Sequence, residues 1–339
     1  MTQYNRRRFL KTAGATGAVG LSAGCLGNLT GGGGGTPTIN FHFVVPVENV
    51  GSLLAIEDIR SQMENLGDAY EISVTRDSST PDSVQAMAAG EADVILTTTV
   101  SFASAVVREA VPGNVTAIAT DFWDAHPDWY SITIFSGPDS GITEPADLEG
   151  QRIGVNATGT GVHAVAVKKL QQVGLDPEND VEFVEFGFPT FISAINEDKM
   201  DAGVFPALFA VGARGNNFNK VFTSAETYDG AYPFAYVTAS NNALDEKGDA
   251  IDAWVDDYVS LFEYARNNRS EVVSLAAEHF GIPEAVIGGF FMQQPTDYYR
   301  GEIATDTERL QTVIDDLNSL GFIDESITVS DHVDNGYLP

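Results

Sequence analysis

A glycine- and hydroxyl-rich turn near the middle of the chain carries the residue types best suited to ligand chemistry. It follows the apolar run Arg152–Val155 and precedes a segment in which apolar residues recur at helical spacing. Such a turn presents unpaired backbone N–H groups at the positive end of a helix dipole, where an anion or polar group can bind. The groups available for this are those of Asn156, Thr158, Gly159, Thr160, Gly161 and His163. An ordinary helix start, with Thr160 as its N-cap and His163 packed against a sheet, is the alternative.

The elements around this turn follow the order strand, helix, strand, helix, strand. Strands are expected at Arg152–Val155, Val181–Phe186 and Ala202–Phe205. One helix is expected from the turn to Gly174 and another at Phe191–Asn196. This pattern predicts a parallel sheet with helices packed on it, and ligands on such sheets collect at the carboxyl ends of the strands.

A second set of strand–helix units precedes this one. Strands are expected at Thr38–Val45, Glu71–Arg76, Ala92–Leu96 and Val115–Thr120, and helices at Ser52–Leu66 and from Pro81 to Gly90. The third strand runs into another hydroxyl-rich turn, in which Thr98, Thr99 and Ser101 are candidate ligand contacts. The two turns are expected to face each other across a cleft, although a threonine triplet also fits simple strand propensity.

The most aromatic stretch, Asp121–Tyr130, lies between these two sets of units. Its Trp123 could stack on a ligand, or the whole stretch could pack a junction between two lobes. The runs Ser131–Phe135 and Phe234–Thr238 are expected to cross between the lobes, which makes the chain a hinged pair. Tyr232 at this hinge is a candidate ligand contact, as are Phe188 and Phe205.

Three segments resemble a known family. DLEGQRIGV, GTGVH and AINEDKMDAGVF are similar to the second lobe of the periplasmic solute-binding proteins of ABC importers, in the group for aliphatic sulfonates, taurine, nitrate and thiamine precursors. The resemblance implies an α/β fold of two lobes, each an open, mostly parallel sheet flanked by helices, with a ligand cleft between them. It implies a first lobe at residues 37–130 and 235–339, including the helices expected from Ala250 to Gly321, and a second lobe at 131–234.

The same resemblance bears on the site and the function. Gly159, Thr160, Gly161 and His163 fall on ligand-contacting positions, and Asp201 falls on a structural aspartate. The Trp-Glu-Pro of many relatives is Phe205-Pro206-Ala207 here, so an acidic pocket residue is missing and an amino-group substrate is less expected. The implied function is capture of a small organic or anionic solute and its delivery to an ABC permease by a monomer. A solute receptor of a sensory system is the alternative.

Residues 1–24 match a twin-arginine export signal. Asn5–Lys11 (NRRRFLK) precedes an apolar run, Ala13–Ala23, that is too short and glycine-rich to persist as a spanning helix. The segment Leu21–Cys25 is close to a lipoprotein cleavage box, and Cys25 is the only cysteine. Residues 25–36 are expected to be a lipid anchor and a glycine-rich spacer, which places the mature protein on the outer face of the cell membrane.

The chain is strongly acidic, with 18 basic and 48 acidic residues and a formal net charge of −30. The export signal holds four basic residues and no acidic one, so the mature chain is more acidic still. Self-repulsion of this size is screened in molar salt, where the Debye length is about 3 Å. The composition therefore indicates a halophilic, archaeal protein, and it excludes nucleic-acid binding, which needs basic patches.

Motifs for catalysis are nearly absent. No nucleophile elbow, His-Glu-x-x-His, Walker loop or EF-hand sequence occurs, so no catalytic residue, metal or cofactor is expected. Gly159–Ala164 fits a loose dinucleotide fingerprint with Glu185 as the ribose acid, but three residues separate the strand from the first glycine, where a tight turn is required. A thiamine-pyrimidine synthase of this fold would carry a cysteine-rich iron-binding motif. The sequence favours binding over both enzymes.

Overall fold

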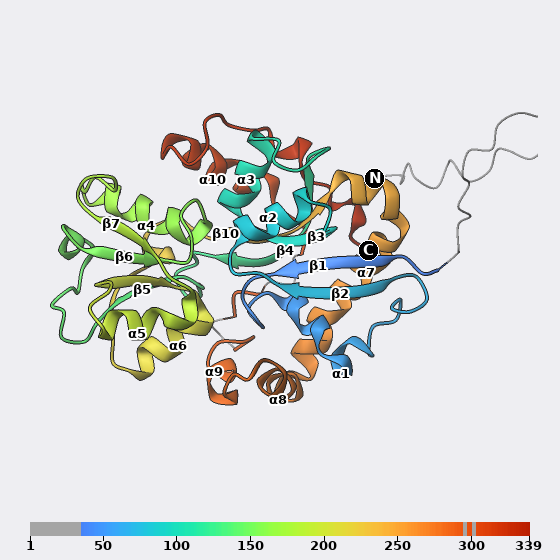
Figure 1. Ribbon diagram of the computed structural model, residues 1–339, viewed down its shortest axis with the longest axis horizontal. Coiled ribbons are helices and arrows are strands. Elements are labelled where there is room, and N and C mark those ends of the chain that lie inside the picture. The colour runs from blue at the N-terminus through green and yellow to red at the C-terminus, as the bar shows by residue number, and fades with distance from the viewer. Residues whose placement is uncertain (1–34, 294–296, 300–302) are drawn as a thin grey trace, which may run out of the picture. The chain divides into compact units, whose positions relative to one another are not determined.

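The computed structural model describes residues 35–293, 297–299 and 303–339. Residues 36–339 form one compact unit built on two five-stranded sheets (Figure 1). We call the parts built on these sheets the first and the second lobe. The export signal, Cys25 and the spacer through residue 34 lie outside the described residues. Among the helices that are described, none has the length and apolarity needed to cross a membrane.

The first sheet has the strand order β2-β1-β3-β10-β4. Its strands are β1 (Thr38–Phe43), β2 (Glu71–Arg76), β3 (Val94–Thr98), β4 (Val115–Asp124) and β10 (Tyr232–Ser240). Strand β10 comes from far along the chain and lies antiparallel between β3 and β4. All of its residues are buried, as expected for a central strand that is covered on both faces.

The second sheet has the order β7-β6-β8-β5-β9. Its strands are β5 (Thr133–Ser136), β6 (Arg152–Val155), β7 (Glu182–Glu185), β8 (Ala202–Phe205) and β9 (Asn219–Thr223). Strand β5 is antiparallel to β8 and β9, and the other pairs are parallel. Asp201 accepts hydrogen bonds from the backbone N–H and the side chain of Arg152, which ties the start of β8 to β6. The predicted α/β class with sheets flanked by helices is confirmed, and both sheets are mixed, because β10 and β5 run antiparallel to their neighbours.

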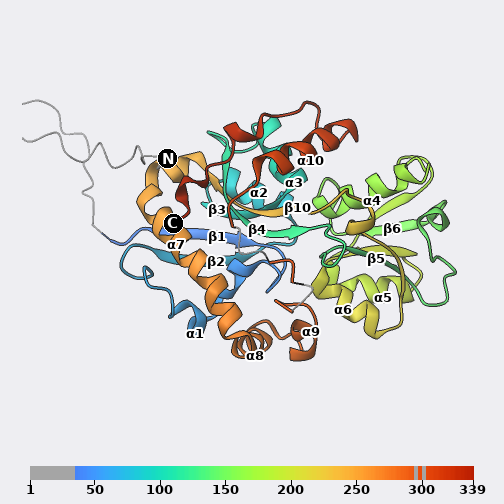
Figure 2. The same ribbon diagram turned by 180° about the vertical axis from the view of Figure 1, so that it is seen from behind.

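Helices cover both faces of each sheet. In the first lobe α2 (Thr80–Ala88), α3 (Thr99–Val107) and α10 (Thr307–Ser319) lie on one side, while α1 (Glu57–Arg60), α8 (Arg269–Phe280) and α9 (Glu284–Gly288) lie on the other (Figure 1). The long helix α7 (Asn241–Asn267) runs across this lobe, as Figure 2 shows from behind. In the second lobe α4 (Gly161–Gln172) faces α5 (Phe191–Asn196) and α6 (Ala207–Gly215) across the sheet (Figure 1).

The helix expected at Ser52–Leu66 is wrong in extent. The chain forms a 3₁₀ turn at Val50–Ala55 and then the short α1, with Ile56 extended between them. This segment buries apolar side chains on more than one face, and Gly51 lies directly against Phe41, whose Cζ would be 2.6 Å from a Cβ at that position. Contacts with other parts of the lobe therefore decide the backbone conformation here, and the long helix that the apolar spacing predicts does not form.

Candidate ligand-binding site

A small cavity lies where the two lobes meet, at the carboxyl ends of their strands. Its volume is about 50 Å³. From the first lobe Glu48, Asn49, Thr98 and Phe234 line it. From the second lobe Asn156, Thr160, Phe188 and Pro206 line it. This volume holds little more than one or two water molecules, so the lobes are closed on each other here.

The two hydroxyl-rich turns touch beside this cavity. The Gly161 N–H donates to Thr98 Oγ1 over 3.0 Å, although Thr98 precedes α3 and makes no side-chain cap to its own helix. Gly161 is the first residue of α4, and a Cβ there would lie 2.9 Å from both Phe234 Cζ and Thr98 Cβ. Only glycine therefore allows the backbone of the second lobe to approach the first lobe this closely.

The rest of the second-lobe turn is held by its own hydrogen bonds. Thr158 donates its N–H and its hydroxyl to Glu185 Oε1, at 2.7 and 2.9 Å. These bonds hold the pKa of Glu185 below its usual range, so this carboxylate is occupied by the turn rather than free for a ribose. The Gly159 N–H donates to His163 Nδ1 at 3.1 Å, and Gly159 has a φ of +71°, which favours glycine. Thr158 and Gly159 thus face away from the cavity.

His163 lies in a separate pocket, which Phe183 and the segment 320–322 also line. Its ring meets the edges of Phe183 and Phe322, with centroid distances of 4.4 and 5.1 Å. Burial lowers the pKa of His163 to about 4, so the ring is neutral at ordinary pH. The ring therefore packs against the segment after α10 and does not reach the cavity.

The other predicted contacts divide between the cavity wall and the layers behind it. Thr98, Asn156, Thr160 and Phe188 line the cavity. Thr99 and Ser101 are buried behind the wall, where their hydroxyls pair with Tyr236 and Thr80. Phe205 packs on Phe135 and Phe191, Tyr232 packs on Tyr228 and Phe234, and Trp123 is part-buried against the core outside the cavity wall.

Glu48 is a cavity residue that the sequence did not reveal. Its carboxylate accepts hydrogen bonds from the Ser131 hydroxyl and, at 3.3 Å each, from the N–H groups of Ala207 and Leu208. Full burial raises its pKa to about 7, although these bonds oppose the shift. A first-lobe carboxylate thus sits at the N-terminus of α6, next to Pro206. The acid of the Trp-Glu-Pro motif is absent at residues 205–207, but Glu48 of the first lobe places an acid in the cavity wall.

A strained loop presents Glu48 and Asn49. Val47 has a φ of +66°, which is unfavourable for a β-branched residue, and its N–H donates to Ser52 Oγ at 2.8 Å. Asn49 Oδ1 accepts from the N–H groups of Val44 and Val45, and its amide donates to the buried Asp121. The one sequence signal for this loop is a pair of polar residues inside an otherwise apolar stretch.

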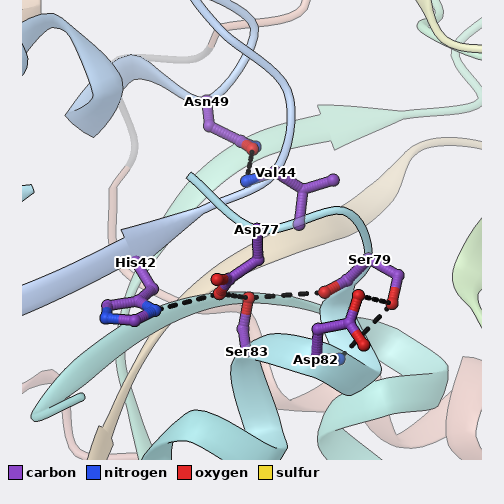
Figure 3. Close-up of polar contacts among 7 residues, drawn as sticks. All are labelled: His42, Val44, Asn49, Asp77, Ser79, Asp82 and Ser83. Atoms are coloured by element: carbon purple, nitrogen blue, oxygen red, sulfur yellow. Dashed lines mark hydrogen bonds and ion pairs between the residues drawn. The ribbon is translucent and has the colours of Figure 1, made fainter. Parts of the chain in front are cut away.

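A histidine, an aspartate and a serine meet beside this loop (Figure 3). Asp77 Oδ2 lies 3.0 Å from His42 Nδ1 and accepts from Ser83 Oγ at 2.6 Å. The carboxylate stands between the ring and the hydroxyl, whereas a nucleophilic triad needs the ring between them to take the proton. The cluster instead ties β1 to the start of α2, which Ser79 caps through the Asp82 N–H.

No candidate metal-binding site is found among the described residues. No group of three or more His, Cys, Asp or Glu side chains gathers there in a way that could hold a metal ion. The cavity wall offers hydroxyl, amide, carboxyl and aromatic groups.

Solved structures share this fold at low sequence identity. The alkanesulfonate-binding protein SsuA from Xanthomonas axonopodis pv. citri, bound to MOPS, is 14% identical with a TM-score of 0.72, over 88% of this chain and 98% of that chain. The periplasmic aliphatic sulphonate binding protein SsuA from Escherichia coli is 16% identical with a TM-score of 0.67, over 87% and 91%. The periplasmic nitrate-binding protein NrtA from Synechocystis PCC 6803 is 11% identical with a TM-score of 0.69, over 90% and 87%.

Comparison of the sequence itself gives a family. No curated protein matches the chain. The family model described as NMT1/THI5 like matches residues 71–270, which is more than half of the chain and spans β2 through α7. The protein therefore belongs to the NMT1/THI5-like family and has the fold of the periplasmic binding proteins.

Proposed function

We propose that this protein is the solute-binding component of an ABC importer, which captures a small solute between its lobes and delivers it to a permease. The observation that carries this proposal is the contact of Gly161 with Thr98 beside a cavity that both lobes line. The fold shared with proteins that are named for alkanesulfonate and nitrate binding supports it. Binding, rather than catalysis, is the activity that this geometry favours.

Lobe closure is the proposed mechanism. Sites for small organic ligands have volumes of about 300–1,000 Å³, so a solute enters only when the lobes move apart. Opening separates Gly161 from Thr98 and Glu48 from the start of α6. A solute then enters between the lobes, and closure buries it.

The hinge of this motion is proposed at the two segments that link the sheets. Asp124 Oδ1 accepts from the Ser131 N–H at 2.7 Å and from the Ser224 hydroxyl at 2.8 Å. The Ser224 N–H donates to the Ile132 carbonyl at 3.1 Å. These bonds hold both crossings together, so the crossings can bend as one unit while each sheet stays rigid.

We further propose that the mature chain begins at Cys25, which carries a lipid and anchors the protein on the outer face of the membrane after twin-arginine export. The monomer is the proposed working form. Mass spectrometry of the protein from its native cells tests the anchor. A lipid-modified N-terminal peptide that starts at Cys25 is expected, and an intact segment 1–24 would refute it.

A thermal-shift screen in molar salt tests the function. The panel contains sulfonates, nitrate, carboxylates, thiamine pyrimidines and NAD. A solute at 100 times its dissociation constant stabilises a protein by about 2.7 kcal/mol, which a melting curve detects. A shift with one solute class supports the proposal. No shift with any member, or a shift with NAD alone, would overturn it.

Site variants then connect binding to the cavity. Thr160→Val combined with Gly161→Ala is expected to weaken binding of that solute at least tenfold, about 1.4 kcal/mol. Thr190→Val with Gly215→Ala is a matched control, because both residues are exposed in the same lobe, away from the cavity. If the two double variants bound the solute with equal affinity, the turn would not be part of the binding site.

A further inference from the structure

The cavity wall offers hydrogen-bond acceptors but no cation. Among its described residues there is no lysine, arginine or histidine, and its one ionisable side chain is Glu48. An oxyanion in this cavity would lie near a buried carboxyl group without a positive partner. Burial of such a charge is unfavourable, so the wall selects against a bare anion.

Helix N-termini near the cavity could hold an anion, but three of them are already engaged. The first N–H groups of α6 donate to Glu48. At the start of α4 the Gly161 N–H donates to Thr98 Oγ1. At the start of α2 the Asp82 N–H donates to the Ser79 hydroxyl. At these three helix starts protein oxygen atoms thus take places that the oxygens of an anion would occupy, while α3 begins without a side-chain cap.

Asn156 provides an acceptor that no described group satisfies. Its Oδ1 is buried, has no hydrogen-bond partner, and belongs to a residue that lines the cavity. A buried acceptor without a donor is unfavourable, and a ligand N–H would satisfy it. This polar atom therefore indicates the kind of group that the site is built to receive.

The remaining wall is apolar and aromatic. The rings of Phe122 and Phe234 stack with centroids 5.5 Å apart, and Phe188 lies on the second-lobe side. Such rings accept a planar or alkyl body by stacking and by burial of apolar surface. The polar and apolar parts of the wall together describe an organic molecule with a donor at one end.

We propose that the solute carries an N–H head group, such as an amine, amidine or amide, which donates to Asn156 Oδ1 and to Glu48, while its apolar body lies against Phe122, Phe188 and Phe234. This inference rests on the proposed binding function and names the solute class of that same cavity. It gives Asn156 and Glu48 the role of specificity-determining residues. It also distinguishes this site from one that takes nitrate or a simple sulfonate.

Matched pairs of probes test this inference with the full chain in molar salt. Each pair shares a body and differs in its head: butylamine against butanesulfonate, benzamidine against benzenesulfonate, and 4-aminopyrimidine against pyrimidine. Thermal shift and calorimetry are expected to detect the N–H member of at least one pair and not its counterpart. Binding of sulfonates or nitrate alone would overturn the inference while leaving the binding function in place. If neither these probes nor any member of the wider solute panel bound, both the inference and the proposed binding function would be overturned.

Two substitutions at one position make the test specific. Asn156→Leu removes the acceptor and is expected to weaken binding of the N–H probe at least tenfold. Asn156→Asp keeps an acceptor oxygen and is expected to retain binding, which excludes a general loss of structure. Asn179→Leu, on the exposed surface of the same lobe, is the control and is expected to change nothing. Unchanged affinity in Asn156→Leu would overturn the assigned role.

Discussion

Gly161→Ala is expected to hold the lobes apart without damaging either of them. Gly161 has no positive φ and begins α4, so alanine suits its backbone conformation. The added Cβ would lie 2.9 Å from Phe234 Cζ and 2.9 Å from Thr98 Cβ, both in the first lobe. Ordinary contacts of a Cβ begin near 3.4 Å. The clash therefore exists only when the lobes are closed.

The size of the effect follows from this overlap. Both contacts are about half an ångström too short, and overpacking of a filled interior costs about 1–3 kcal/mol. Because this energy falls on the closed state alone, the ratio of closed to open molecules is expected to fall about 5- to 150-fold. The apparent affinity for a solute that only the closed state encloses falls by up to the same factor.

Distances between spin labels measure this shift directly. Cys25 is the only cysteine, so a Cys25→Ser background accepts labels at Glu91→Cys in the first lobe and Asp139→Cys in the second, both exposed. Gly161→Ala is expected to lengthen the distance relative to the parent, with and without the solute from the screen. Gly215→Ala, whose Cβ would meet no atom within 4 Å, is the control. Identical distances in Gly161→Ala and in the parent would refute the reasoning.

Three further predictions concern buried groups. Burial raises the pKa of Asp121 to about 7, above an unfolded value near 4. The contribution of Asp121 to the free energy of unfolding is therefore lost as pH rises toward 8. In molar salt the melting temperature of Asp121→Asn should depend less on pH than that of the parent. Phe322→Ala exposes the His163 ring and should raise the pKa of His163 from about 4 toward its ordinary value, as ring NMR resonances would report. When the lobes are closed, Glu48 has a pKa of about 7. The fraction of closed molecules, measured by the label distance, should therefore fall as pH rises from 5 to 8. Glu48→Gln should remove this pH dependence.

The sequence predicts the elements well where the local pattern and the packing agree. The strands Glu71–Arg76, Arg152–Val155 and Ala202–Phe205 have the predicted bounds, and so does the helix Phe191–Asn196. Three of them are short, mainly apolar segments with polar or glycine residues beside them, whereas Glu71–Arg76 (EISVTR) alternates polar and apolar residues. The helix α6 and the strand β9 were not predicted. Burial along Ala207–Phe222 follows contacts with other elements rather than one clear period.

The candidate site was harder to predict because it depends on the direction in which each side chain points. Within one turn Asn156 and Thr160 face the cavity, while Thr158 and Gly159 face away. The hydrogen bonds from Thr158 to Glu185 set this difference, and Glu185 lies 27 positions after Thr158 in the chain. The loop that presents Glu48 adopts a positive φ at a valine, which no local pattern indicates.

Glu48 links lobe closure to solute selection. In the closed lobes its carboxyl group is buried at the start of α6, where it accepts hydrogen bonds and lines the cavity. This burial raises its pKa, so protonation of Glu48 favours closure. Asp124 lies close enough to raise the pKa of Glu48 further, and Ser131 donates to both carboxyl groups. A cationic N–H head would be attracted to these two acids, whereas an anion would be repelled by them. The group whose protonation is coupled to closure is thus also sensitive to the charge of what the lobes enclose.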